Sequence, residues 1–314
     1  MSTGYRRAAR RCRSVNQVNA LHIALENRMT PPELVALHAA QGRWFGLRMW
    51  LQRAWRLLPA AWRRADAETA PEALRDEWLR KLHRFYTQAV KPTPEPFRRR
   101  KLSRHLRLYS AGGPRHDKTL LMCFVGGSNR PFLPLPVFLQ HLDAARTDVL
   151  LVGYPRGKGL RGGLPELGPS FEASIDRLPG LAGLDGYRRC VALGTSGGGT
   201  PAVLAALRLG LPAALSAGGG APTDPRWTAA LGEDVGVLAR RYADASASPP
   251  HLMLAFGVDA KEDVAAAEAW ARCVPAELHA VRDGRRPAPH NLFALLLRRR
   301  RLQRFLESTL LPPP

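Results

Sequence analysis

From about residue 104 onward, short uninterrupted apolar runs alternate with longer helix-like segments. The predicted strands are 105–110, 119–126, 148–154, 190–194, 213–218, 252–257 and 277–281. The predicted helices include 135–145, 170–178, 198–209, 261–273 and 291–308. Because the runs are continuous rather than alternating, we expect strands buried on both faces. The pattern predicts an α/β fold: a mostly parallel sheet, with 105–110 as an antiparallel leader, flanked by helices.

The chain before this region has a helical pattern. Residues 1–95 are predicted to form a helical region, because apolar residues recur at three-to-four spacing in stretches such as 33–59. That stretch resembles one tetratricopeptide-type hairpin, and 77–94 resembles a partial second unit. A solenoid needs about three repeats, so an ordinary helical bundle is the favoured interpretation. The Pro-rich, basic run 91–101 indicates a linker, placed at 96–103, before an α/β domain of 104–314.

The net formal charge of +21 is concentrated near the N-terminus, where residues 1–110 carry 23 Lys and Arg against 8 Asp and Glu. Such an excess attracts nucleic acid or anionic lipid. A generally Arg-rich composition is the favoured explanation, and no zinc finger, RNP-like run or aromatic ladder accompanies the charge. The sequence therefore predicts no nucleic-acid partner, and charge alone supports contact with a membrane surface.

Cysteine usage and hydropathy favour a cytoplasmic protein. The four cysteines are far apart and form no CxxC pair, which argues against a zinc cluster or a disulfide framework. No window approaches the ~18 consecutive apolar residues of a membrane span. No apolar segment follows the basic N-terminus, so we expect no secretory signal. Neither a metal site nor a cofactor is predicted.

One serine lies among glycines in the segment GTSGGG, residues 194–199, between a predicted strand and a predicted helix. Gly194-x-Ser196-x-Gly198 in this context matches the nucleophile elbow, in which a sharp turn lifts the serine hydroxyl above the sheet. The alternatives are a glycine turn with an idle serine, or a phosphate-binding loop. The segment matches neither phosphate-loop motif, so the sequence favours Ser196 as a nucleophile.

A serine nucleophile needs a histidine base, and in this type of sheet the histidine comes last in the chain. Three histidines follow Ser196. His251 precedes a predicted strand, at the wrong end of the sheet, and His279 lies inside the last strand. His290 follows that strand in a Pro-containing loop, so it is the predicted base.

The acid that orients the base is expected after the preceding strand, in the segment FGVDAKEDV. Asp259 comes two residues after the predicted strand end and is the first choice. Asp263 falls at or inside the following helix and is the second choice. Either carboxylate also suits a helix N-terminus, where it complements the dipole.

An oxyanion hole requires two backbone N–H groups. Gly197, the residue after the nucleophile, is expected to supply one. The other is expected from the loop VGGSNRPF, residues 125–132, through Gly127 or Ser128. This loop follows the first central parallel strand, and its glycines allow the backbone to approach an anion closely.

With these motifs, residues 104–310 resemble the α/β-hydrolase superfamily. The matching segments are GTSGG, FVGGSN, FGVDAKED and PHN. The runs PVFLQHLD and LGTSGGG also resemble an uncharacterised bacterial group within that superfamily. The resemblance implies a mostly parallel eight-stranded sheet and hydrolysis of an ester, thioester or amide through an acyl-serine. The loop lacks the usual His-Gly, and the short segment 219–250 leaves no room for a large lid domain.

Three functions follow from this reading. The first is a serine hydrolase acting on a small-molecule ester or thioester, with Ser196, His290 and Asp259 as its triad. The second is an acyltransferase that uses the same triad. The third is a non-catalytic hydrolase-like scaffold, whose region 1–95 binds a protein partner. The intact set of serine, histidine and carboxylates favours the first over the third.

Overall fold

This computed structural model describes residues 2–13, 15–26, 29, 33–34, 36–37, 40, 79–80, 96–127, 129–154, 159–284 and 287–311. The chain forms two units. Unit 1 comprises Met1–Pro96 and Pro134–Gln140, and unit 2 comprises Phe97–Leu133 and His141–Pro314. In the part of the chain that is described, no helix is long and apolar enough to cross a lipid bilayer.

Unit 1 begins with two helices, α1 (Ser2–Arg11) and α2 (Val15–Glu26). They share a small apolar cluster formed by Tyr5, Ala9, Cys12, Val18, Leu37 and Leu79. The rings of Tyr5 and His22 meet edge to face inside it. The short helix α6 (Leu135–Leu139) also belongs to this unit. Most of 33–59 and 77–94 lies outside the described residues, so the tetratricopeptide-like hairpin stays a prediction.

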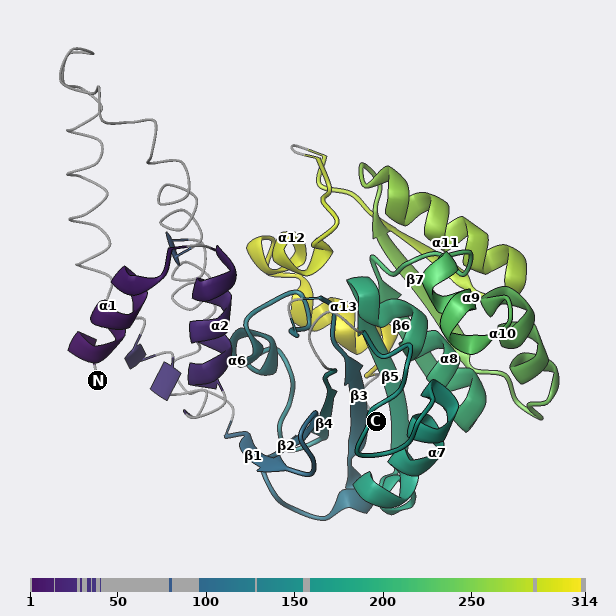
Figure 1. The fold of residues 1–314 in the computed structure, drawn as a ribbon, viewed down its shortest axis with the longest axis horizontal. Helices are drawn as coiled ribbons and strands as arrows, with labels where there is room; N and C mark the ends of the chain where they lie inside the picture. Colours follow the sequence, from purple (N-terminus) through teal and green to yellow (C-terminus); the bar gives the residue numbers. More distant parts are fainter. Residues whose placement is uncertain are drawn as a thin grey trace, which may run out of the picture. The chain divides into compact units, whose positions relative to one another are not determined.

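Unit 2 is built on one eight-stranded sheet with the order β1-β2-β4-β3-β5-β6-β7-β8 (Figure 1). Its strands are β1 (Arg98–Lys101), β2 (Leu106–Ser110), β3 (Thr119–Phe124), β4 (Thr147–Val152), β5 (Arg189–Thr195), β6 (Ala213–Ala217), β7 (His251–Gly257) and β8 (Glu277–Val281). β1 and β2 are antiparallel, and β3 to β8 run parallel to one another. The predicted class, an α/β-hydrolase fold with a mostly parallel sheet, is confirmed.

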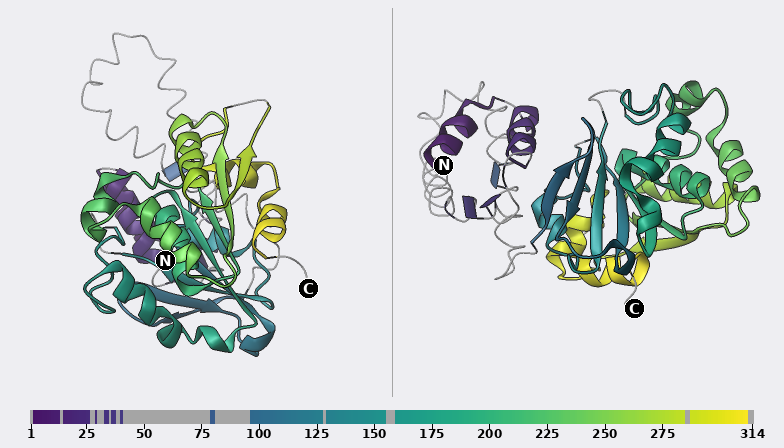
Figure 2. Two further views of the ribbon diagram at one scale, coloured as in Figure 1. Left: turned by 90° about the vertical axis from the view of Figure 1, so that its right-hand side faces the viewer. Right: turned by 90° about the horizontal axis from the view of Figure 1, so that it is seen from below.

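Helices cover both faces of this sheet, as Figure 2 shows for α7 and α8 on one face and α12 and α13 on the other. The helices of unit 2 are α7 (Phe171–Ala182), α8 (Gly199–Leu209), α9 (Pro225–Leu231), α10 (Val235–Asp244), α11 (Lys261–Cys273), α12 (Leu292–Arg298) and α13 (Leu302–Thr309). Every residue of β3, β4 and β6 is buried. This explains the continuous apolar runs, because neither strand face meets water.

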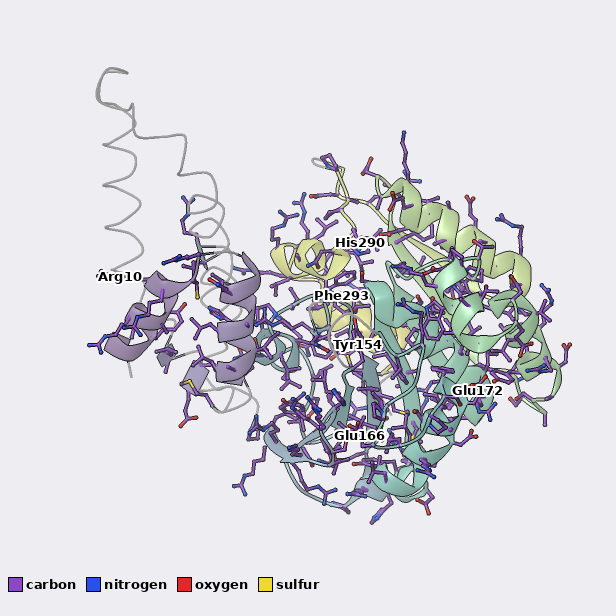
Figure 3. The ribbon with its side chains drawn as sticks, viewed as in Figure 1. Arg10, Tyr154, Glu166, Glu172, His290 and Phe293 are labelled. Carbon is purple, nitrogen blue, oxygen red and sulfur yellow. The ribbon has the colours of Figure 1, made fainter. Side chains whose placement is uncertain are left out.

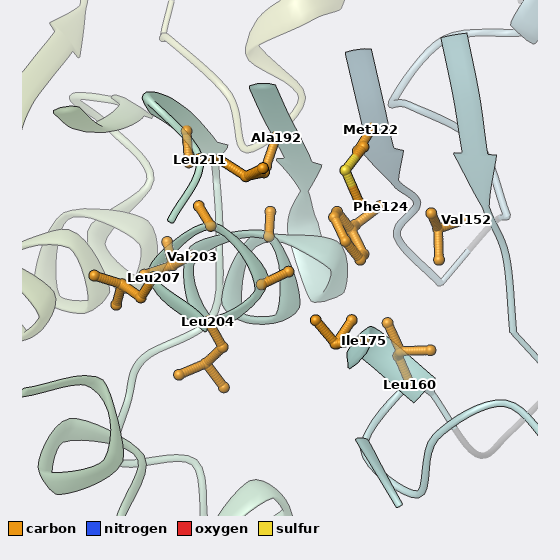
Figure 4. Close-up of a cluster of buried hydrophobic side chains, with 14 of the residues drawn as sticks. Met122, Phe124, Val152, Leu160, Ile175, Ala192, Val203, Leu204, Leu207 and Leu211 are labelled. Carbon is orange, nitrogen blue, oxygen red and sulfur yellow. The ribbon is translucent and has the colours of Figure 1, made fainter. Parts of the chain in front are cut away.

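The main core lies between the sheet and the helices that include α7 and α8 (Figure 4). Met122 and Phe124 of β3 pack there with Ile175 of α7 and with Val203 and Leu207 of α8. Each of these side chains is at most 3% exposed. Burying a side chain of this size contributes about 1.5–3 kcal/mol, so this layer holds α8, and the turn before it, firmly against β3 and β5.

Several predicted boundaries were wrong. Arg98–Lys101, assigned to the linker, form edge strand β1, whose four side chains are exposed and therefore need no apolar pattern. The predicted helix 291–308 is two helices, because Arg300 adopts a left-handed backbone with φ 55° between them. The helix expected at 135–145 ends at Leu139. The segment 219–250 contains α9 and α10, which sequence reading missed.

Candidate active site

Ser196 occupies a sharp turn between β5 and α8. The turn is a short 3-10 helix, Ser196–Gly198, that leads directly into α8. Ser196 has φ 52°, a left-handed conformation that costs a non-glycine residue about 1–3 kcal/mol. Its hydroxyl therefore lies at the carboxyl end of β5, above the N-terminus of α8, where the helix dipole favours negative charge.

The glycines on either side of Ser196 are required by close backbone packing. A Cβ on Gly194 would lie 2.1 Å from the Gly198 carbonyl oxygen, and one on Gly198 would lie 2.1 Å from that of Phe124. A Cβ on Gly197 would meet nothing within 4 Å. Two of the three glycines thus allow the turn to form, whereas the third faces open space.

We expect Gly198→Ala to destabilise the protein by about 3 kcal/mol, because the new methyl group overlaps the backbone of β3. Gly197→Ala is the matched control, and its free energy of unfolding is expected to change by less than about 1 kcal/mol. Urea denaturation of both variants measures the difference. Equal stability of the two would contradict the packing described for this turn.

His290 approaches Ser196 from the loop between β8 and α12, and Figure 3 labels it beside Phe293 of α12. Its Nε2 lies 3.0 Å from the Ser196 Oγ. Its Nδ1 lies 2.8 Å from each carboxylate oxygen of Asp263. The structure therefore brings a serine, a histidine and a carboxylate into one hydrogen-bonded chain. Its three members are far apart in sequence.

The carboxylate beside His290 is the second choice from the sequence, Asp263, and not the first, Asp259. Asp263 lies in the first turn of α11, where side chains lean back toward the helix N-terminus. That direction is toward the carboxyl end of β7, which precedes the helix. Asp259 is exposed, and its Oδ2 accepts a 2.7 Å hydrogen bond from the Ala288 N–H. It thereby ties the β7–α11 turn to the loop that carries His290.

The electrostatic setting of His290 suits a proton acceptor. Its hydrogen bond to Asp263 raises the pKa of the imidazole above the usual 6.5, although partial burial acts in the opposite direction. The charges of Asp263 and Glu262 raise this pKa further. The Asp263 side chain is only 9% exposed, whereas that of His290 is 49% exposed. The imidazole is thus held by a buried carboxylate and remains open to solvent and small molecules.

The glycine turn after β3 lies beside Ser196. A Cβ on Gly126 would lie 2.8 Å from the Thr195 carbonyl oxygen and 3.0 Å from the Ser196 Cβ. Gly127, the next residue, is exposed, and a Cβ on it would meet nothing within 4 Å, as at Gly197. Ser128 lies outside the described residues. The structure therefore places Gly127 and Gly197 on turns that flank the serine.

His251 and His279, the other two histidines that follow Ser196 in the sequence, take no part in the Ser196–His290–Asp263 hydrogen bonds. His251 begins β7, and its Nε2 pairs with Glu277 Oε2 at 3.0 Å. His279 lies within β8 and packs edge to face on Phe305, with ring centroids 5.2 Å apart. Over the described ranges, no three His, Cys, Asp or Glu side chains are grouped so that they could hold a metal ion.

Sequence reasoning missed two residues that contact the site. The ring of Phe132 meets that of His290 edge to face, with centroids 5.2 Å apart. The Asn291 Nδ2 donates a 2.9 Å hydrogen bond to the Phe132 carbonyl oxygen, and its Oδ1 caps α12 by accepting from Ala294 N–H. The position of Asn291 before an apolar helix is a typical cap signal, whereas nothing in the sequence marks Phe132.

Comparison with known proteins gives similarity to solved structures alone. No protein-family model matches the chain, and no curated protein matches it. Esterase B from Lactobacillus rhamnosis is 14% identical, covers 78% of this chain and 98% of its own, and gives a TM-score of 0.44. Dienelactone hydrolase from Anabaena variabilis is 16% identical over 68% and 99%, with a TM-score of 0.44. A thermostable esterase from Pseudomonas putida is 14% identical over 74% and 86%, with a TM-score of 0.45.

Proposed function

We propose that this protein is a serine hydrolase that cleaves a small-molecule ester or thioester through an acyl-serine intermediate. The observation that supports this most strongly is the hydrogen-bonded chain Ser196–His290–Asp263. Its serine lies on a strained turn after a parallel strand, which is the geometry that exposes a nucleophile. The α/β sheet itself hosts many functions, so the proposal rests on the site.

In this mechanism, Ser196 Oγ attacks the acyl carbon while His290 Nε2 takes the hydroxyl proton. The tetrahedral oxyanion accepts hydrogen bonds from the N–H groups of Gly197 and Gly127. When the tetrahedral intermediate collapses, the bond between the acyl carbon and the alcohol oxygen or thiol sulfur breaks. The alcohol or thiol leaves with the proton from His290. Water then attacks the acyl-serine with the same proton transfers, and the carboxylic acid is released. Asp263 orients the imidazole and stabilises its charged form.

The other candidate activity, acyl transfer, shares every step up to the acyl-serine. It differs only in that an acceptor hydroxyl replaces water in the second half. The chemistry needs no cofactor in either case. A protein partner for residues 1–95, contact with a membrane surface and a cytoplasmic location stay predictions from the sequence.

The proposal is tested by treating the full-length protein with a fluorophosphonate and measuring the intact mass and the peptide map. We expect one adduct per chain, on the peptide that contains Ser196, because this reagent phosphonylates activated serines. Heat-unfolded protein is the control, and it is expected to remain unlabelled. A folded protein that resists the reagent would favour the non-catalytic scaffold.

A further inference from the structure

The loop between β3 and α6 places one strained aromatic residue against the imidazole of His290. Phe132 has φ 61°, a conformation that bulky side chains rarely adopt. The Leu133 N–H donates to the Pro131 carbonyl oxygen at 2.7 Å, so Phe132 is the central residue of a tight three-residue turn. Strain of this kind persists only where the surrounding structure imposes it, and it is concentrated at functional sites.

Hydrogen bonds hold this loop to both sides of the site. The Thr195 hydroxyl donates to the Arg130 carbonyl oxygen at 3.4 Å, which connects the loop to the residue before Ser196. The Asn291 amide donates to the Phe132 carbonyl oxygen at 2.9 Å, which connects it to the residue after His290. Phe132 is therefore fixed relative to both the serine and the histidine.

The Phe132 ring also lies against two buried residues, Gly218 and Phe293. A Cβ on Gly218 would lie 3.1 Å from the Phe132 Cζ, 3.1 Å from an Asp263 carboxylate oxygen and 3.0 Å from the His290 carbonyl oxygen. The ring also meets Phe293 edge to face, with centroids 5.8 Å apart. The Phe132 ring thus has little freedom to move away from His290.

The two hydrogen bonds of His290 depend on how its ring is turned about the Cβ–Cγ bond. Asp263 contacts Nδ1 and Ser196 contacts Nε2, so a turn about that bond displaces both nitrogens from their partners. A contact against the ring resists such a turn. The Phe132 ring lies at 88° to the imidazole plane, with centroids 5.2 Å apart, and supplies that contact.

We propose that Phe132 is a positioning residue that fixes the plane of the His290 ring, so that Nε2 points at the Ser196 hydroxyl. This inference rests on the proposed function for its kinetic consequence, but the contact can be tested without it. A base that is misaligned by a rotation loses proton-transfer rate more than substrate affinity. The expected signature is a lower kcat with little change in KM.

The test compares Phe132→Leu and Phe132→Met with Phe305→Leu in the full-length protein. Phe305 is the matched control, because it makes the same edge-to-face contact at 5.2 Å with His279, which lies away from Ser196. With p-nitrophenyl butyrate, we expect both Phe132 variants to lose about tenfold in kcat, with KM within about twofold. Phe305→Leu is expected to lower the Tm and leave kcat unchanged.

A second measurement is independent of turnover: the proton NMR line of the His290 Nδ1–H, followed in the wild type and in Phe132→Met. We expect the line to broaden in the variant, because a rocking imidazole exchanges this proton faster with solvent. Unchanged kcat together with an unchanged line would overturn the role of Phe132. A raised KM at constant kcat would also overturn it, since Phe132 would then be a substrate contact. Failure of wild-type phosphonylation overturns only the proposed hydrolase, and the NMR line still tests Phe132.

Discussion

Ser196→Ala is expected to lower kcat for p-nitrophenyl butyrate by about 10⁵-fold, because no acyl-enzyme can form without the hydroxyl. His290→Ala is expected to lose a similar factor, since its Nε2 is 3.0 Å from the Ser196 Oγ and is the proposed proton acceptor. The double variant should be no slower than either single variant, because the two side chains act as one unit.

Stopped-flow and long-incubation assays of these three variants measure the effect, with circular dichroism to show that each remains folded. His279→Ala is the control, because this histidine packs on Phe305. If the loss of kcat in the double variant equalled the product of the two single losses, Ser196 and His290 would act separately. Full activity of Ser196→Ala would exclude the proposed nucleophile.

Asp263→Asn is expected to lower kcat about 10³- to 10⁴-fold, because an amide beside Nδ1 favours the wrong tautomer of the imidazole. Asp259→Asn, its matched control, is expected to change kcat by less than about threefold. An asparagine at 259 keeps an oxygen that accepts from the Ala288 N–H, and that hydrogen bond is the contact described for Asp259. The reverse order of effects would assign the acid to Asp259.

The pH dependence separates the same two variants. In the wild type, the hydrogen bond from Asp263 raises the His290 pKa above 6.5, and a general base acts only when neutral. Activity should therefore rise with pH through a midpoint above 6.5. In Asp263→Asn the midpoint should move to lower pH, whereas in Asp259→Asn it should stay where it is. Profiles of kcat/KM between pH 5 and 9 measure both.

The centre of the fold was predictable because strands β3, β4 and β6 are buried on both faces, which leaves a clear apolar signal in the sequence. The runs at 119–126 and 213–218 correspond closely to β3 and β6, all of whose residues are buried. Strand β1 was not predicted, because an exposed edge strand imposes no apolar pattern on Arg98–Lys101. Its pairing with β2 depends on backbone hydrogen bonds, which any residue except proline supplies.

The candidate site was only partly predictable. Ser196 and His290 are singled out by a glycine-flanked turn and a loop after the last strand, which are visible in the sequence, and their side chains lie 3.0 Å apart in the structure. The choice of Asp259 over Asp263 was made on distance from the strand end. That measure ignores the backward lean of side chains in a first helical turn, which brings Asp263 to the imidazole. The contact of Phe132 depends on its positive φ, which sequence patterns do not reveal.

Strand β1 has a consequence for the behaviour of the protein in concentrated solution. Within the described sheet β1 pairs with β2 alone, and its four side chains are cationic and exposed. An open strand edge would otherwise template pairing with a second copy of the chain. Here two approaching edges would bring eight positive charges together, and their repulsion opposes growth of the sheet between molecules. Because salt shortens the range of this repulsion to about 3 Å at 1 M, colloidal stability should depend on ionic strength.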